Sequence, residues 1–318
     1  MADALGIKAK MGVKSVATWA TAYAAVDTAI PFVDESITRN YARVQRSALL
    51  GYGGRESSDQ GVQTTQGTVN FELDYNNFIP ILKQAMGAEA GGVITITDTI
   101  DSLFLWLEFE KQVSRYRAGP AKATKFTISG DANSTDPVKL SVEYTCRDVV
   151  QSATAFPAIT PSTPDRVIFR HLTLFRLGDQ GDALAAGDQL PLQSFELSFD
   201  RAYKTDDYGS ALTEPEMPLA PAENDFRSAS LKLKFARYAA DTIPAWKDAD
   251  TALQCAFLFS GPSAQTFGIE VPNMRITEGF DAPIGGPGPL VLEGTLELAR
   301  SLAGHPMYTG NEFRITIV

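Results

Sequence analysis

The chain has 318 residues, a formal net charge of −10 and a hydrophobic content of 44%. That length allows one large or two medium domains, and the composition is typical of a globular protein. The acidic balance argues against sequence-independent nucleic-acid binding, which requires clustered lysines and arginines to neutralise phosphates.

The N-terminal region predicts an extended arm rather than a membrane-targeting segment. Residues 1–34 contain scattered aromatic residues and many alanines, without the continuous apolar run of a signal peptide. The most apolar stretch, LFLWLEF at 103–109, is too short to span a bilayer as a helix. We therefore expect no membrane contact and synthesis in the cytoplasm.

A long polar loop and an alternating strand follow the arm. Residues 45–66 are rich in Gly, Ser and Gln, and loops of that length are usually functional or disordered. In 67–76, hydrophobic and polar residues alternate, which predicts a strand with Glu72 and Asp74 on its polar face. The spacing then becomes helical, with Asn76 or Asn77 placed to cap the helix and Gly87 placed to end it.

Residues 103–110 predict another strand, and 125–144 predict a hairpin with one apolar and one polar face. Phe126 and Ile128 share the apolar face, whereas Lys139 and Glu143 share the polar face. An antiparallel hairpin of this kind packs its apolar face on a core and exposes the other to water.

The same order of elements begins again after a Pro-, Ser- and Thr-rich linker at 151–165. A strand at 192–203 is followed by a long Pro-, Asp- and Glu-rich stretch at 204–225, and then by a strand, a short helix, a strand and a hairpin. This order indicates a duplication. We predict an arm at 1–34, a first domain at 35–155 and a second domain at 156–318.

Sequence features of an enzyme or a metal site are missing. The two histidines lack metal-ligand spacing, the two cysteines predict buried free thiols, and no phosphate-binding or nucleophile motif occurs. Glu72 and Asp74 could be read as a glycosidase pair, but two carboxylates on one polar strand face are usually just solvated. We expect no enzyme activity, no cofactor and no metal.

Three segments stand in a characteristic order: PFVDESI at 31–37, GTVNFELDYNNFIPILKQAMG at 67–87 and YRAGPAKATKFTISGDANSTDPVKLSVEYTCRDV at 116–149. The series resembles the tail tube proteins of long-tailed bacteriophages, in which an aromatic arm leads to a PF-x-x-ES segment, a strand running into a helix, and a hairpin. It covers about the first 150 residues. The second half departs from the pattern, because its helix lacks the terminal glycine and its hairpin tip is longer, and it is interpreted as a diverged copy.

The resemblance implies a mainly β fold: two tandem β-sandwich domains, each with a flanking helix and a four-stranded inner sheet that joins a tube-lining barrel. It implies a virion protein of the phage tail that assembles into stacked rings, with three two-domain chains per ring. The implied partners are further copies of the chain, the tape measure, tail tip and tail terminator proteins, and genomic DNA that passes without specific binding.

An acid-biased channel lining is expected, because acidic residues in a confined space repel phosphate. The predicted lining residues are Glu72, Asp74, Lys139, Glu143, Glu196, Asp200, Lys232, Lys234, Glu293 and Glu297. The arm and the two long loops are expected to be flexible in free subunits and to contact neighbouring rings, with candidate stacking residues Leu50, Tyr52, Arg55, Asp59, Tyr208, Leu212 and Met217.

Two other classes of protein fit parts of the pattern. A carbohydrate-binding or adhesion β-sandwich would explain the strands and the acidic surface, but not the ordered series of segments. An outer-membrane barrel would share the alternation, but it needs outward apolar residues and a signal peptide.

Overall fold

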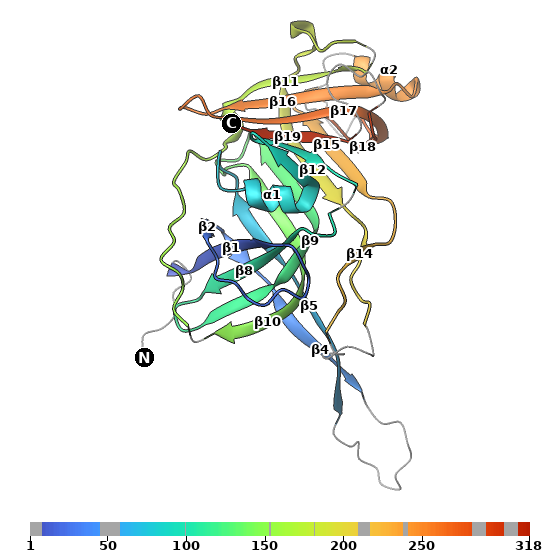
Figure 1. Cartoon of the computed structure of the whole chain (residues 1–318). Helices are drawn as coiled ribbons and strands as arrows, with labels where there is room; N and C mark the ends of the chain where they lie inside the picture. Colours follow the sequence, from blue (N-terminus) through green and yellow to red (C-terminus); the bar gives the residue numbers. More distant parts are fainter. Residues whose placement is uncertain are drawn as a thin grey trace, which may run out of the picture.

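The protein is mainly β in the computed structural model, which describes residues 8–44, 58–98, 100–152, 154–180, 182–208, 217–237, 241–281, 291–301 and 311–318. The fold is elongated, with two stacked halves joined by long curved strands (Figure 1). We call β1 to β10 the first half and β11 to β19 the second half.

The first half contains ten strands and one helix among the described residues. They are β1 (Lys10–Val16), β2 (Thr28–Ile30), β3 (Asp34–Glu35), β4 (Thr38–Val44), β5 (Asp59–Glu72), α1 (Ile79–Met86), β6 (Gly87–Ala90), β7 (Val93–Ile96), β8 (Phe104–Glu110), β9 (Arg115–Asp131) and β10 (Lys139–Ser152).

The second half contains nine strands and one α-helix among the described residues, with two short 3-10 helices at Phe169–His171 and Ala186–Asp188. The other elements are β11 (Leu172–Asp179), β12 (Leu192–Asp200), β13 (Tyr203–Lys204), β14 (Ala222–Glu223), β15 (Ser228–Phe235), α2 (Thr242–Asp248), β16 (Leu253–Ser260), β17 (Thr266–Gly279), β18 (Leu292–Leu298) and β19 (Arg314–Ile317).

Each half has an inner sheet and an outer sheet that share long strands. The inner order is β3 and β4, β5, β10, β9 in the first half and β12, β15, β18, β17 in the second. The outer order is β2, β1, β8, β9 in the first half and β11, β16, β17, β19 in the second. Among the described residues, the inner sheet of the second half has the expected four strands. That of the first half has four strand positions, because β3 and β4 share the edge beside β5.

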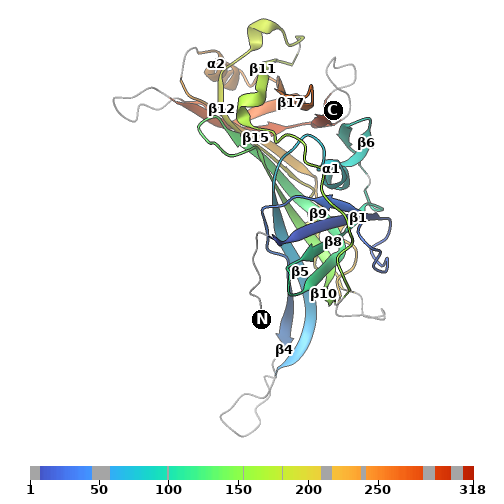
Figure 2. The same ribbon diagram turned by 90° about the vertical axis from the view of Figure 1, so that its left-hand side faces the viewer.

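The two inner sheets join into one curved sheet through β9 and β12. Their antiparallel register runs from Lys125 opposite Asp200 to Asp131 opposite Ser194. A second connection pairs β19 with β7. In Figure 2 the long strands form one side of the molecule, and α1 and β1 lie on the other side.

A β-bulge occurs at the same place in both halves. In the β9–β10 ladder the extra residue is Thr124, whose hydroxyl donates to the carbonyl of Glu143 at 3.2 Å. In the β17–β18 ladder the extra residue is Thr277, whose hydroxyl donates to the carbonyl of Thr295 at 3.1 Å. Thr124 therefore corresponds to Thr277, and Glu143 to Thr295.

A second register shift, between the outer strands, supports this correspondence. The β8–β9 shift begins at Ala121 and the β16–β17 shift begins at Met274, and each lies three residues before the threonine of its bulge. Bulges bend a strand and increase its twist. The two halves thus bend their long strands in the same way and at the same points.

The core lies between the inner and outer sheets and is continuous across the two halves. Phe126 of the first half packs at 5.5 Å from Phe199 of the second, and Phe313 contacts both rings. Cys146 and Cys255 are free and fully buried, and burial raises the pKa of both thiols. The expectation of buried free thiols is confirmed.

The entry to α1 differs from the sequence prediction. Neither asparagine caps the helix; instead Asp74 Oδ1 accepts hydrogen bonds from the backbone N–H groups of Asn76 at 2.9 Å and Asn77 at 2.7 Å. The first helical turn begins after Phe78, which makes no side-chain cap bond. Gly87 ends the helix with a φ of 127°, as predicted, because a left-handed position at a helix end favours glycine.

The predicted N-terminal arm is part of the fold over much of its length. β1 pairs with β8 along its whole length and with β2, and Met11 and Val13 are buried in the core. The Tyr23 hydroxyl donates to the buried Glu108, and burial raises the pKa of Tyr23. The expectation of an extended, free arm was wrong for residues 10–30, because β1 completes the outer sheet.

Lys122 is buried on β9, and none of the carboxylates in the described part of the chain lies within ion-pair distance of its ammonium. Its ammonium donates to the carbonyl of Ile100 and lies 4.6 Å from the centre of the Phe104 ring. Desolvation lowers the pKa of Lys122 to about 8. The folded state therefore loses this proton near pH 8, whereas an unfolded lysine keeps it to about pH 10.4.

Replacing Lys122 with Met should raise the free energy of unfolding at pH 7, because the buried charge is removed and the aliphatic stem is kept. Wild-type stability gains from deprotonation of Lys122 between about pH 8 and pH 10, so the advantage of Lys122→Met should shrink over that window. Urea unfolding of both proteins at pH 7 and pH 10 checks this. A constant difference between them would contradict it.

Candidate functional site: the polar face of the joined sheet

Polar side chains alternate with buried apolar ones along the central strands of the joined inner sheet. In β12 and β15 the buried residues are those facing the core, such as Leu197 and Leu231, and the residues between them are at least partly exposed. Because residues directly opposite one another in a ladder point to the same face, the register assigns each polar side chain to that face.

Four rows of residues cross the sheet on this polar face. The rows are Asp131–Ser194–Lys234–Glu293; Glu72–Lys139–Ser129–Glu196–Lys232–Thr295–Glu278; Asn70–Ser141–Thr127–Ser198–Ser230–Glu297–Arg275; and Thr68–Glu143–Lys125–Asp200–Ser228. Two of these rows extend from β5 of the first half to β17 of the second. The polar face is therefore one surface shared by both halves.

Acidic residues outnumber basic ones on these rows. There are eight carboxylates and five cationic groups, so the rows carry a net charge of 5 − 8 = −3. The carboxylates are Glu72, Asp131, Glu143, Glu196, Asp200, Glu278, Glu293 and Glu297, and the cations are Lys125, Lys139, Lys232, Lys234 and Arg275.

Ion pairs between neighbouring strands reduce the negative electrostatic potential of this surface. Glu196 lies 3.4 Å from Lys232, and Glu293 lies 3.2 Å from Lys234. Pairs of this kind between exposed side chains contribute about 0–1 kcal/mol each to stability. Their larger effect is to fix side-chain positions, while the three excess carboxylates leave the surface negative.

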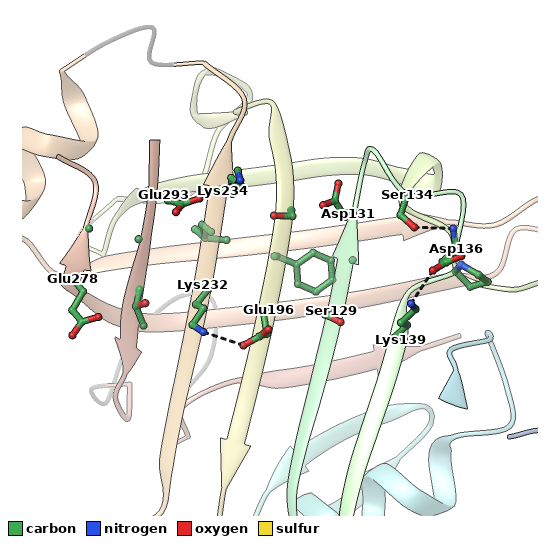
Figure 3. Close-up of a pocket in the computed structure, with 18 residues that line it drawn as sticks. Ser129, Asp131, Ser134, Asp136, Lys139, Glu196, Lys232, Lys234, Glu278 and Glu293 are labelled. Carbon is green, nitrogen blue, oxygen red and sulfur yellow. Dashed lines mark hydrogen bonds and ion pairs between the residues drawn. The ribbon is translucent and has the colours of Figure 1, made fainter. Parts of the chain in front are cut away.

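The middle of the polar face is hollowed where the hairpin tip of β9 and β10 rises beside β12 and β15. The hollow has a volume of about 600 Å³. Figure 3 shows its labelled residues on neighbouring strands and, for Ser134 and Asp136, in the turn between β9 and β10. Lys232 is directed to Glu196, and Lys139 is directed to Asp136. The lining therefore carries mixed charges from neighbouring strands and from the turn between β9 and β10.

Nine of the ten predicted lining residues lie on the polar face. They are Glu72, Lys139, Glu143, Glu196, Asp200, Lys232, Lys234, Glu293 and Glu297. Glu72 is also paired with Arg166 at 3.0 Å. Whether this face lines a channel stays a prediction.

Asp74 is the exception, and its predicted exposure was wrong. β5 ends at Glu72, and the chain then turns into α1. The carboxylate of Asp74 is only 3% exposed and accepts bonds from Asn77 Nδ2 at 2.6 Å in addition to the two backbone groups. Asp74 therefore holds the strand-to-helix turn.

The predicted stacking residues are placed differently. Leu50, Tyr52, Arg55 and Leu212 lie outside the described residues, and Met217 is half-buried. Asp59 lies opposite Val44 at the outer end of the β4–β5 hairpin, which projects from the body in Figure 1. Residues 59–66 were expected in a loop but belong to β5, and Tyr208 packs within the chain, where its hydroxyl donates to the carbonyl of Gln63 at 2.9 Å.

The comparison with known families agrees with this architecture. A family model described as phage tail tube protein matches residues 6–299, nearly the whole chain. No curated protein matches the chain. The chain belongs to the phage tail tube protein family, which makes it a structural protein of the virion tail. No helix in the described part of the chain is long and apolar enough to cross a membrane.

Proposed function

We propose that three copies of the chain form a ring in which the joined inner sheets close into a barrel, and that these rings stack into the tail tube. The repeated arrangement carries this proposal. Each chain supplies eight inner strand positions in two equivalent sets, so three chains give a ring with six similar units. Closing the sheet would also protect the edge strands, which otherwise invite aggregation.

The dimensions support a channel for DNA. About 24 strands spaced by about 4.8 Å and tilted by about 40° give a backbone diameter near 50 Å, and side chains leave roughly 40 Å. Duplex DNA fits within that space with room for water. The role is structural rather than enzymatic.

The polar face is the proposed channel lining. Its excess of carboxylates would keep the DNA phosphates from binding to the wall during ejection. The paired lysines reduce the repulsion without reversing it, so the lining is acid-biased rather than uniformly acidic.

The division into two domains at 35–155 and 156–318, and their origin in a duplication, belong to the same proposal. The matching bulges at Thr124 and Thr277 support a common origin. Further partners would be the tape measure protein inside the tube, the tail tip and tail terminator proteins at its ends, and neighbouring rings contacted through the segments at 45–58 and 204–225.

Native mass spectrometry of assembled rings tests the stoichiometry. We expect trimers, because one chain supplies two ring units. Rings of six whole chains would contradict the proposal, since they would need about 48 inner strands and a channel about twice as wide.

A further inference from the structure

Phe226 has the most exposed large apolar side chain among the described residues. Its side chain is 94% exposed, immediately before β15. The neighbouring Arg227 is held by Asp98 at 2.9 Å and Glu312 at 2.8 Å, so the position of Phe226 on the surface is fixed. Burying such a ring gains about 1.5–3 kcal/mol, which makes it a candidate contact for a partner.

The two bulges show which residue of the first half stands in the place of Phe226. Glu143 lies opposite Thr68, and its counterpart Thr295 lies opposite Lys232, so Thr68 corresponds to Lys232. Counting back along β5 and β15 then matches Val62 with Phe226 and Gln63 with Arg227.

Side-chain contacts agree with this match. Gln63 Nε2 donates to Asp148 Oδ1 at 2.8 Å, near the end of β10. Arg227 Nε donates to Glu312 Oε1 at 2.8 Å, just before β19. β19 pairs with β17 as the end of β10 pairs with β9, so the two contacts occupy equivalent places.

In the first half a segment of the second half covers Gln63, which is 1% exposed, and leaves its neighbour Val62 38% exposed. The connection between β12 and β15 brings the Tyr208 hydroxyl to the Gln63 carbonyl at 2.9 Å and to Thr64 Oγ1 at 3.3 Å. It also brings the Pro218 carbonyl to Trp19 Nε1 at 2.9 Å. The β12–β15 connection joins the first two inner strands of the second half. It therefore lies over the first half, which precedes the second half along the joined sheet.

We propose that Phe226 is a contact site for a second copy of this chain, whose first half lies beside the second half of this one. In the second copy, the hairpin of β4 and β5 corresponds to the connection between β12 and β15. It would therefore reach Arg227 as that connection reaches Gln63, and the exposed ring of Phe226 stands next to Arg227. The free edge of β4 supports this, because β4 pairs only with β5 among the described residues and exposes nearly every side chain. Such a head-to-tail contact gives a ring when its rotation closes, as the proposed three-chain ring requires.

This inference rests on the proposed ring assembly, and Phe226→Ser tests it separately. Val113→Ser is the matched control, because Val113 is 75% exposed in the turn between β8 and β9, away from the corresponding positions. Both variants should unfold at the wild-type temperature, since neither side chain is buried. We expect at least a tenfold loss of ring and tube assembly for Phe226→Ser, measured by sedimentation and electron microscopy, and none for Val113→Ser.

Chemical modification of a cysteine at position 226 measures the burial of this site directly. Phe226→Cys adds one accessible thiol, because Cys146 and Cys255 are fully buried. A maleimide should modify it in isolated subunits and react at least tenfold more slowly in rings. If wild-type rings form while the thiol stays reactive and Phe226→Ser assembles normally, the contact is wrong and the proposed function stands. If wild-type chains never form rings, both are contradicted.

Discussion

Replacing Glu72, Glu143, Glu196 and Glu293 with lysine is expected to leave folded subunits and complete tails but to slow or arrest DNA ejection. Each change adds two positive charges, so the chain's formal charge moves from −10 to −10 + 8 = −2, and the polar face becomes strongly positive. All four side chains are at least partly exposed, so each substitution should change stability by only about 0.5 kcal/mol. The effect should weaken at high salt, because charges are screened over about 8 Å at physiological ionic strength.

The sheet itself offers a matched control for that variant. In this control, the glutamate and the lysine of each pair change places, in both the Glu196–Lys232 and the Lys234–Glu293 pair. The net charge of the polar face stays the same. Particles that carry the exchanged pairs should eject DNA at the wild-type rate, which the fluorescence of a DNA dye in single particles measures. Unchanged ejection by the four-lysine variant at low salt would show that the polar face does not line the channel.

The second large effect is expected for Arg201→Ala, which should lower the free energy of unfolding by about 3–5 kcal/mol, because hydrogen bonds to a charged group contribute about 1.5–3 kcal/mol each. Arg201 is 1% exposed and joins the halves, because it follows β12 and reaches the C-terminus of α1 in the first half. Its guanidinium donates to the carbonyls of Ala85 at 3.0 Å and Met86 at 2.5 Å, where the helix dipole is negative. It also donates to the Thr97 carbonyl and pairs with Glu223.

Arg166→Ala is the control for this loss of charge, because Arg166 is exposed and its pair with Glu72 lies at the surface. Its effect should stay below about 1 kcal/mol. Denaturant unfolding of the two variants and the wild type provides the comparison. Equal midpoints for Arg201→Ala and Arg166→Ala would mean that the buried guanidinium does not hold the halves together.

The strands of the inner sheet could be predicted because apolar and polar residues alternate within each short segment of sequence. In SFELSFD at 194–200 every second residue is apolar, and the structure buries those residues in β12. The hairpin of β9 and β10, the helix end at Gly87 and the polar-face positions of Glu143 and Glu196 follow from the same period and from turn residues.

Residues at bulges and turns could not be assigned in this way. Glu278 lies two residues after the partly buried Ile276, so strict alternation places it toward the core. The extra residue Thr277 shifts the register and moves Glu278 to the polar face. Asp74 fails for a related reason, because β5 ends at Glu72 and alternation no longer applies.

Contacts between distant segments were also beyond the sequence pattern. Nothing local marks Arg201 as a partner of α1, or shows that residues 10–16 complete the outer sheet beside β8. The alternation does not place Asp131 on the polar face, because this residue stands at the hairpin turn, whereas the β9–β12 ladder extends to it. These features depend on how the halves pack, which alternation does not encode.

A reconstruction of the assembled tube by electron cryomicroscopy, without imposed symmetry within the ring, tests the central claim most directly. The account predicts three chains per ring, with the row that contains Glu196 and Lys232 facing the channel in every chain. A tube in which that row faces outward, or a ring of six whole chains, would contradict it.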